Sequence, residues 1–175
     1  GTAGSGRTSF LNMIELRARS RRVVRIDATF HPRDEGLVGA LSTELGCPDY
    51  PLAVTQALLT EPTLVVVDDL GHHVMPNPAG IHELEELLRI VVDTARQVSW
   101  AVSAESRELV DLAELVPIYS VFAARQRLAP VDGATLERVV EAREKLAGLE
   151  VQYPRGPLLA ALGRRETRRR RRRRA

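Results

Sequence analysis

Two short stretches of this chain combine glycine, hydroxyl and charged residues at regular spacings. The first is GTAGSGRTS at positions 1–9, which matches the pattern G-x-x-x-x-G-K-[ST] at every fixed position except one, where Arg7 replaces lysine. Glycines let a backbone curl until consecutive N–H groups point inward, and the positive end of the helix that follows attracts a phosphate. The spacing therefore predicts a phosphate-binding loop that opens a helix. The plainer interpretation is a flexible Gly/Ser-rich segment that matches by chance.

The side chains of this loop have expected roles. Arg7 keeps the positive charge of the lysine, although a planar guanidinium on a longer stem meets the β- and γ-phosphates differently from a compact ammonium. The hydroxyl of Thr8 is expected to ligate Mg²⁺. The contacts to the nucleotide phosphates are expected from Gly4, Ser5, Gly6, Arg7, Thr8 and Ser9.

The second stretch is TLVVVDD at positions 63–69. A continuous β-branched run without alternation predicts a strand covered on both faces, as in parallel sheets flanked by helices. Carboxylates at the end of such a strand lie where ligands bind in open α/β sheets. We expect Asp68 to hold Mg²⁺ through water and Asp69 to orient or deprotonate an attacking water. The alternative is a polar strand end that turns into a loop.

The elements that would position these residues alternate along the chain. Helices are expected at 7–20, 35–45, 52–59, 81–98, 105–115 and 132–147, and strands at 23–28, 63–67, 99–104 and 118–124. Strands that alternate with helices indicate βαβ units and a parallel sheet. The predicted fold class is therefore α/β, with a mostly parallel sheet and helices on both of its faces.

Charge is distributed unevenly over the 175 residues. The net charge is +2, but nine arginines and one glutamate at positions 164–175 carry +8, which leaves −6 on the rest of the chain. A block of like charges repels itself, stays unfolded and can bind nucleic acid by counterion release. We expect the arginines from Arg164 to Arg174 to bind nucleic acid without specificity, if they bind it, because no aromatic residue is interleaved for base stacking.

The rest of the composition is that of an ordinary globular domain. Cys47 is the one cysteine of the sequence, so an internal disulfide is excluded. The sequence contains neither a secretory signal nor an apolar run long enough to cross a membrane. We therefore expect a cytoplasmic chain without a membrane span, and with enough apolar residues for one core.

Over roughly residues 1–150 the chain resembles the AAA+ and STAND-type ATPase modules of bacteria. The stretches that carry the resemblance are GTAGSGRTS, TLVVVDDL, GIHELEELLRIVVDTARQVSWAVSAES and RLAPVDGATLERVVEAREKLAGLEVQY. In that family the first is the Walker A loop, the second is the Walker B strand, the third carries a polar sensor residue, and the last belongs to a helical lid. The resemblance implies a P-loop NTPase three-layer fold that binds ATP and Mg²⁺.

The family's site residues carry over to the matching positions. Asp68 matches the metal-binding aspartate, Asp69 stands where the family usually has a catalytic glutamate, and Ser103 matches the sensor. Arg7 and Asp69 are therefore the expected catalytic residues. The resemblance also implies that Arg125 or Arg127 faces the nucleotide of a neighbouring subunit in a homo-oligomer. Because arginine replaces the lysine and aspartate replaces the glutamate, we expect hydrolysis to weaken more than binding.

In that family a strand leads into the glycine loop, and this strand is missing before Gly1. We therefore expect an excerpt of a longer protein with flanking domains. The expected division is a nucleotide-binding core at 1–129, a partial helical lid at 130–163 and an arginine-rich disordered tail at 164–175.

Three functions stay open at this point. The chain is either an ATP-hydrolysing module of a larger regulatory or remodelling protein, or a nucleotide-binding switch or scaffold module without hydrolysis. The third candidate is a metal-dependent hydrolase, whose ligands would have suitable chemistry although their spacing matches no established zinc pattern. Its candidate ligands are Asp68, Asp69, His72, His73 and His82.

Overall fold

The structure is a computed structural model that describes residues 1, 5–18, 20–27, 30–74, 77–122, 124–129 and 131–147. It divides into two compact units, Gly1–Pro130 and Val131–Ala175. Several predicted features lie outside the described residues: Gly4 of the phosphate loop, the arginines from Arg164 to Arg174, and half of the lid, namely residues 130 and 148–163.

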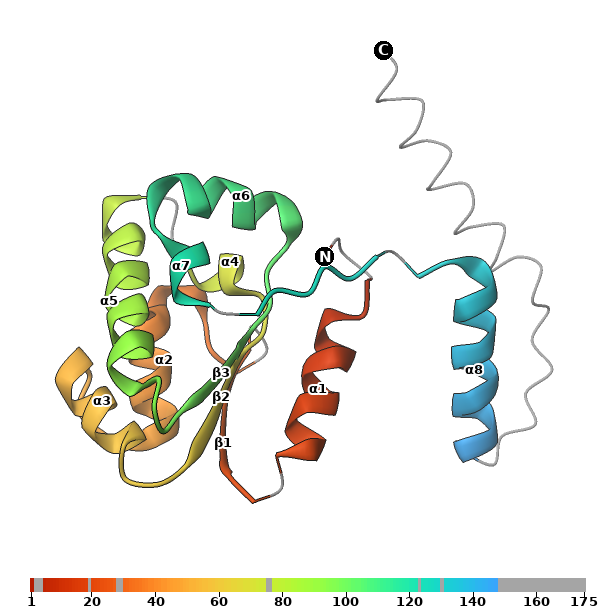
Figure 1. Cartoon of the computed structure of the whole chain (residues 1–175), viewed down its shortest axis with the longest axis horizontal. Coiled ribbons are helices and arrows are strands. Elements are labelled where there is room, and N and C mark those ends of the chain that lie inside the picture. The colour runs from red at the N-terminus through yellow and green to blue at the C-terminus, as the bar shows by residue number, and fades with distance from the viewer. Residues whose placement is uncertain are drawn as a thin grey trace, which may run out of the picture. The chain divides into compact units, whose positions relative to one another are not determined.

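The first unit is built on a parallel sheet of three strands in the order β1-β2-β3 (Figure 1). The strands are β1 (Arg22–Ile26), β2 (Thr63–Val67) and β3 (Ser99–Val102). Val65 of β2 pairs with Val24 on one side and Trp100 on the other. Every residue of β2 is buried, which confirms the prediction of a strand covered on both faces.

Helices cover both faces of this sheet, as the sequence predicted (Figure 1). On one face, α1 (Arg7–Arg17) packs Leu11 against Leu64 and Val66 of β2. On the other face, Val24 and Val65 pack into the main core. The helices that share this core include α2 (Gly36–Leu45), α3 (Pro51–Leu58) and α5 (Pro78–Thr94). Successive residues of a strand point to opposite faces, so β2 contributes to both clusters.

Shorter elements connect these layers. They are a 3₁₀ turn (Arg33–Glu35), α4 (Leu70–His73), α6 (Ser106–Leu115) and α7 (Ile118–Val121). The second unit contains α8 (Gly133–Ala147), whose start is capped by the Asp132 carboxylate accepting from the Thr135 N–H at 2.7 Å. The Asn77 side chain caps α5 in the same way, accepting from the Gly80 N–H at 2.9 Å.

Two sequence-based expectations are wrong. Residues 118–124 were expected to form a strand, but Ile118–Val121 is a helical turn followed by irregular chain. A strand needs a hydrogen-bonding neighbour, and among the described residues β3 has a strand on one side only. Val116 and Ile118 are buried in the main core from either side of Pro117. No helix was expected between the strand at 63–67 and the helix at 81–98, but α4 covers Leu70–His73 and α5 begins at Pro78.

Candidate functional site

The predicted phosphate loop ends in an uncapped helix start. Gly6 has a left-handed backbone with φ 81°, which glycine adopts without steric cost, and its carbonyl accepts from the Phe10 N–H at 2.9 Å. Among the described residues no side chain caps α1, and its first turn holds no acidic residue. The first backbone N–H groups of a helix have no partner within the helix. Those of α1 are therefore ready to bind an anion.

Ser5, directly before this glycine, is buried in an unusual way. The residue is only 7% exposed, and its Oγ has no hydrogen-bond partner among the described residues. Buried hydroxyls are normally paired. An unpaired hydroxyl beside a helix start is what a phosphate-binding loop would keep for its ligand.

Arg7 brings the glycine loop and the acidic pair together. Its Nη1 donates to Oδ1 of Asp69 at 3.1 Å, across 62 positions of sequence. The Arg7 side chain is 16% exposed and that of Asp69 is 43% exposed, so the pair is at a partly open surface. Gly1 lies beside the end of β3, because its ammonium donates to the Ala104 carbonyl at 3.3 Å and its carbonyl accepts from the Ser106 N–H at 3.0 Å.

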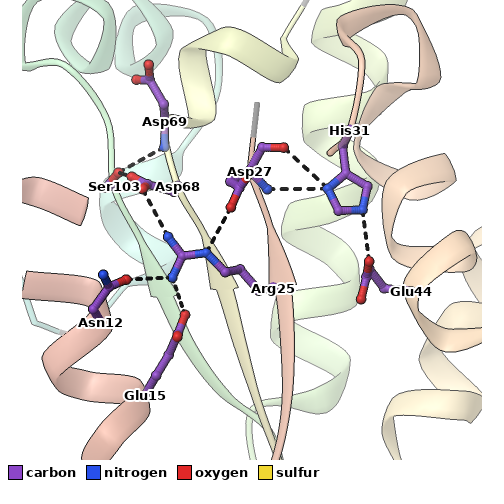
Figure 2. Close-up of polar contacts among 9 residues, drawn as sticks. All are labelled: Asn12, Glu15, Arg25, Asp27, His31, Glu44, Asp68, Asp69 and Ser103. Carbon is purple, nitrogen blue, oxygen red and sulfur yellow. Dashed lines mark hydrogen bonds and ion pairs between the residues drawn. The ribbon is translucent and has the colours of Figure 1, made fainter. Parts of the chain in front are cut away.

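Ser103, at the end of β3, connects the two aspartates at the end of β2 (Figure 2). Its Oγ donates to Oδ1 of Asp68 at 2.6 Å and accepts from the backbone N–H of Asp69 at 2.9 Å. This contact fixes the turn in which Asp69 has a left-handed backbone with φ 64°. The structure thus places the predicted residues Arg7, Asp68, Asp69 and Ser103 in one contiguous group.

Arg25 of β1 is part of the same group, and the sequence analysis missed it. Its Nη2 donates to Oδ2 of Asp68 at 3.2 Å and its Nε donates to Oδ2 of Asp27 at 3.0 Å. Its Nη1 donates to Asn12 at 2.9 Å and also contacts Glu15, both on α1 (Figure 2). Burial alone would lower the pKa of Arg25, but the hydrogen bonds to Asp27 and Glu15 raise it. An arginine inside the short apolar strand RVVRI was the signal in the sequence.

The polar network extends from Arg25 to α2. Nδ1 of the buried His31 lies 3.3 Å from the Asp27 carbonyl and 3.4 Å from its backbone nitrogen (Figure 2). Nε2 of His31 lies 3.2 Å from Oε1 of Glu44. The site is therefore linked to helices on both faces of the sheet.

Four other predicted residues are exposed to solvent. Thr8 and Ser9 are exposed on the first turn of α1. Arg125 and Arg127 are exposed as well, and the Arg125 guanidinium lies 4.7 Å from the centre of the Tyr119 ring. A cation–π contact of this kind holds Arg125 against its own chain.

The histidines do not form the metal site of the hydrolase alternative. His82 is exposed near glutamates of its own helix, whereas His73 is fully buried. Burial lowers the pKa of His73, and neither of its ring nitrogens has a hydrogen-bond partner among the described residues. In the described part of the chain, no three His, Cys, Asp or Glu residues come together as metal ligands.

A cleft of about 430 Å³ follows the outer edge of β3. Arg7 and Ser103 contribute to its lining, while Leu11, Ile14 and Trp100 form apolar parts of its wall. Trp100 also packs against the main core and donates from Nε1 to the Thr94 hydroxyl at 3.1 Å. The apolar walls do not suit a triphosphate, so the loop would suit a phosphate better than this cleft does.

The arrangement fits a bound phosphate better than a bound divalent cation. The helix start after Gly6 offers backbone N–H groups, and Arg7 offers a positive charge. Ser5 offers a hydroxyl that has no partner among the described residues. Both carboxylate oxygens of Asp68 are already hydrogen-bonded, one of them to the cationic Arg25. Mg²⁺ binding by Thr8 and Asp68 therefore stays a prediction that this arrangement does not favour.

None of the helices in the described ranges combines the length and the apolar character that a membrane span requires. No protein-family model matches the chain, and no curated protein matches its sequence. Among solved structures, the ORC1 protein of Aeropyrum pernix in complex with DNA has a similar fold, with a TM-score of 0.62 and 19% sequence identity. The likeness covers 83% of this chain and 42% of that protein, so this chain matches less than half the length of ORC1. The chain therefore has an α/β fold, with a parallel sheet between two layers of helices.

Proposed function

We propose that this chain is a nucleotide-binding module of the AAA+ type and that its ligand is ATP. The observation that carries the proposal is the contact of Arg7 with Asp69, which brings the start of α1 to the acidic end of β2. The resemblance of the sequence to AAA+ modules and the fold likeness to ORC1 both support it. The same proposal includes three finer points: the STAND-type subclass, a role inside a larger regulatory or remodelling protein, and assembly into a homo-oligomer.

Each member of the group has a role in this proposal. The backbone N–H groups at the start of α1 and the Ser5 hydroxyl bind phosphate oxygens, and Arg7 neutralises their charge. Nη1 of Arg7 now contacts Asp69, and the transfer of this contact to a phosphate oxygen would release the carboxylate. Asp69 is then free to orient a water towards the terminal phosphate. Ser103 fixes the positions of both aspartates, because it hydrogen-bonds to the Asp68 carboxylate and to the Asp69 N–H.

We propose that ATP hydrolysis is slow or absent. Asp69 is shorter than the glutamate usual in the family, and its left-handed backbone is fixed by Ser103. A carboxylate held in that way reaches less far towards a bound phosphate. Binding of ATP without turnover would make the module a switch.

The proposal is tested by titrating a fluorescent ATP analogue into the wild-type protein and two variants. Arg7→Ala removes a charge-assisted contact, which is worth about 1.5–3 kcal/mol, so the affinity should fall about 10- to 100-fold. Arg17→Ala is the control, because Arg17 is an exposed arginine at the far end of the same helix. Unchanged affinity in Arg7→Ala, or equal losses in both variants, would contradict the proposal.

Phosphate release, measured on the same samples, separates hydrolysis from binding alone. Asp69→Asn keeps the size of the side chain and removes the charge, so a hydrolysing module should lose turnover while it keeps most of its affinity. A wild-type protein that binds ATP but releases no phosphate is a switch.

Nucleic-acid binding by the arginines from Arg164 to Arg174 stays a separate prediction. It is favoured by the net charge of residues 164–175, which is +8 from nine arginines and one glutamate. A chain that ends at Gly163 should lose DNA affinity together with its steep salt dependence, which a binding titration at several salt concentrations measures.

A further inference from the structure

The guanidinium of Arg25 is held in one orientation by acceptors from different parts of the first unit. Nη1 contacts Asn12 and Glu15 on α1, Nε contacts Asp27 after β1, and Nη2 contacts Asp68 after β2 (Figure 2). The side chain is only 24% exposed. Because a guanidinium is planar and rigid, it cannot turn away from Asp68 without disturbing its other contacts.

A divalent cation bound to Asp68 would compete directly with this guanidinium. Oδ2 of Asp68 lies 3.2 Å from Nη2 of Arg25, and Oδ1 already accepts from Ser103 at 2.6 Å. Mg²⁺ binds oxygen ligands at about 2.1 Å in an octahedral arrangement. An ion at that distance from Oδ2 would be next to a fixed positive charge, which repels it.

We propose that the guanidinium of Arg25 takes the place of a divalent cation beside Asp68, so that this chain binds ATP with little dependence on Mg²⁺. The inference rests on the proposed nucleotide site. In that site an unpaired Asp68 carboxylate would repel a triphosphate. Arg25 neutralises this charge inside the protein, which leaves Arg7 and the start of α1 to neutralise the phosphates.

The charge balance around Arg25 predicts the effect of removing it. One guanidinium faces the carboxylates of Glu15, Asp27 and Asp68. In Arg25→Gln these three carboxylates would stay close together without their cation. Such a cluster repels a triphosphate and attracts a divalent cation. The variant should therefore bind ATP weakly without metal and regain affinity when Mg²⁺ is added.

The first arm of the test measures ATP affinity in EDTA and in excess Mg²⁺. The wild-type affinity should differ less than about 3-fold between the two conditions, whereas that of Arg25→Gln should differ at least about 10-fold. Arg22→Gln is the matched control, because Arg22 is on the same strand and pairs with Glu61 at the opposite end of it, so its variant should behave as the wild type. A wild-type affinity that rises about 10-fold or more with Mg²⁺ would overturn the proposal.

The second arm needs no nucleotide. Mn²⁺, which serves as a spectroscopic probe of divalent sites, is titrated into the nucleotide-free proteins and followed by electron paramagnetic resonance. Arg25→Gln should bind Mn²⁺ at least about 10-fold more tightly than the wild type, and adding Asp68→Asn should remove the gain. Wild-type Mn²⁺ binding that depends on Asp68 would overturn the proposal even if Arg25→Gln failed to fold.

The two arms distinguish the failure of this inference from that of the proposed function. If the wild type binds no ATP in either condition, the proposed function is wrong. The Mn²⁺ arm then still decides whether Arg25 excludes a divalent cation from Asp68.

Discussion

Asp69 combines a left-handed backbone, with φ 64°, and two polar contacts that connect α1, β2 and β3. Backbone strain of this kind is tolerated where the surrounding contacts require it, and it is frequent at functional sites. Here the Ser103 hydroxyl accepts from the Asp69 N–H, while Arg7 donates to the carboxylate. The residue is therefore held in place at both its backbone and its side chain.

The strain at Asp69 predicts an inverted ranking of two substitutions. Asp69→Gly and Asp69→Ala both remove the carboxylate, but only glycine adopts this backbone without steric cost. Asp69→Gly should therefore be more stable than Asp69→Ala by about 1 kcal/mol in urea unfolding. At most other positions alanine is the more stable of the two, so an alanine variant of equal or higher stability would show that φ is not constrained here.

Ser5 offers a substitution that separates ligand binding from folding. Its buried Oγ has no hydrogen-bond partner among the described residues, so Ser5→Ala removes a polar atom without breaking a described bond. The free energy of unfolding should stay the same or rise, while ATP affinity falls about 2- to 10-fold because one hydrogen bond to phosphate is lost. Thermal unfolding and the ATP titration measure the two effects. A variant that loses stability and keeps its affinity would remove Ser5 from the site.

His73 predicts a dependence of stability on pH. Burial lowers its pKa most, nearby His72 and His31 lower it further, and Asp69 and Asp27 act in the opposite direction. The folded pKa is thus below the unfolded value of 6.5, so the unfolded state binds more protons below that pH. Stability should be fully present above about pH 6.5 and should fall as the pH drops towards the folded pKa.

Two variants test the contribution of His73. His73→Leu should weaken the loss of stability between about pH 7 and pH 5, as measured by urea unfolding at each pH. His82→Leu, at an exposed histidine, should keep the wild-type dependence. The same steep dependence in both variants would assign the effect to another group.

Helix α5 shows how one side chain fixes the start of an element. Asn77 has an extended backbone and its carboxamide accepts from the Gly80 N–H at 2.9 Å, while Pro78 occupies the first helical position. Asn77→Ala should lower the free energy of unfolding by about 1 kcal/mol, since an alanine cannot cap the helix. Gln97→Ala, in the exposed turn after the same helix, should change it little. Equal effects would show that the cap does not stabilise the fold.

At the level of elements, the sequence predicted what local patterns determine. The unbroken apolar run of β2 and the apolar stripe of α5 are features of single segments. The strand formed at the expected residues, and the helix formed at Pro78–Thr94 where 81–98 was expected. The strand expected at 118–124 did not form, because a strand depends on a neighbour that its own residues do not supply. Within α1, Leu11 faces the sheet whereas Leu16 is 63% exposed.

For the whole first unit, the parallel sheet explains both what the sequence revealed about the site and what it did not. Parallel strands bring their carboxyl ends to one edge, and this places Asp68 and Asp69, which the sequence located after β2, in contact with Ser103 after β3. Arg25 was missed because it is located before the end of β1 and its acceptors come from α1 and two strand ends. Such contacts form only when the strands are paired in their observed register, and the residues of one segment do not determine that register.

The central claim is that the start of α1 and the acidic end of β2 bind one triphosphate together. Hydrogen exchange with and without ATP, resolved to short peptides by mass spectrometry, tests it most directly. Saturation with ATP should slow exchange in the peptide that covers residues 5–10 and in the peptide around Asp68 and Asp69, with α3 unchanged as the internal reference. Protection that leaves both of these peptides unchanged while ATP is bound elsewhere would contradict the account.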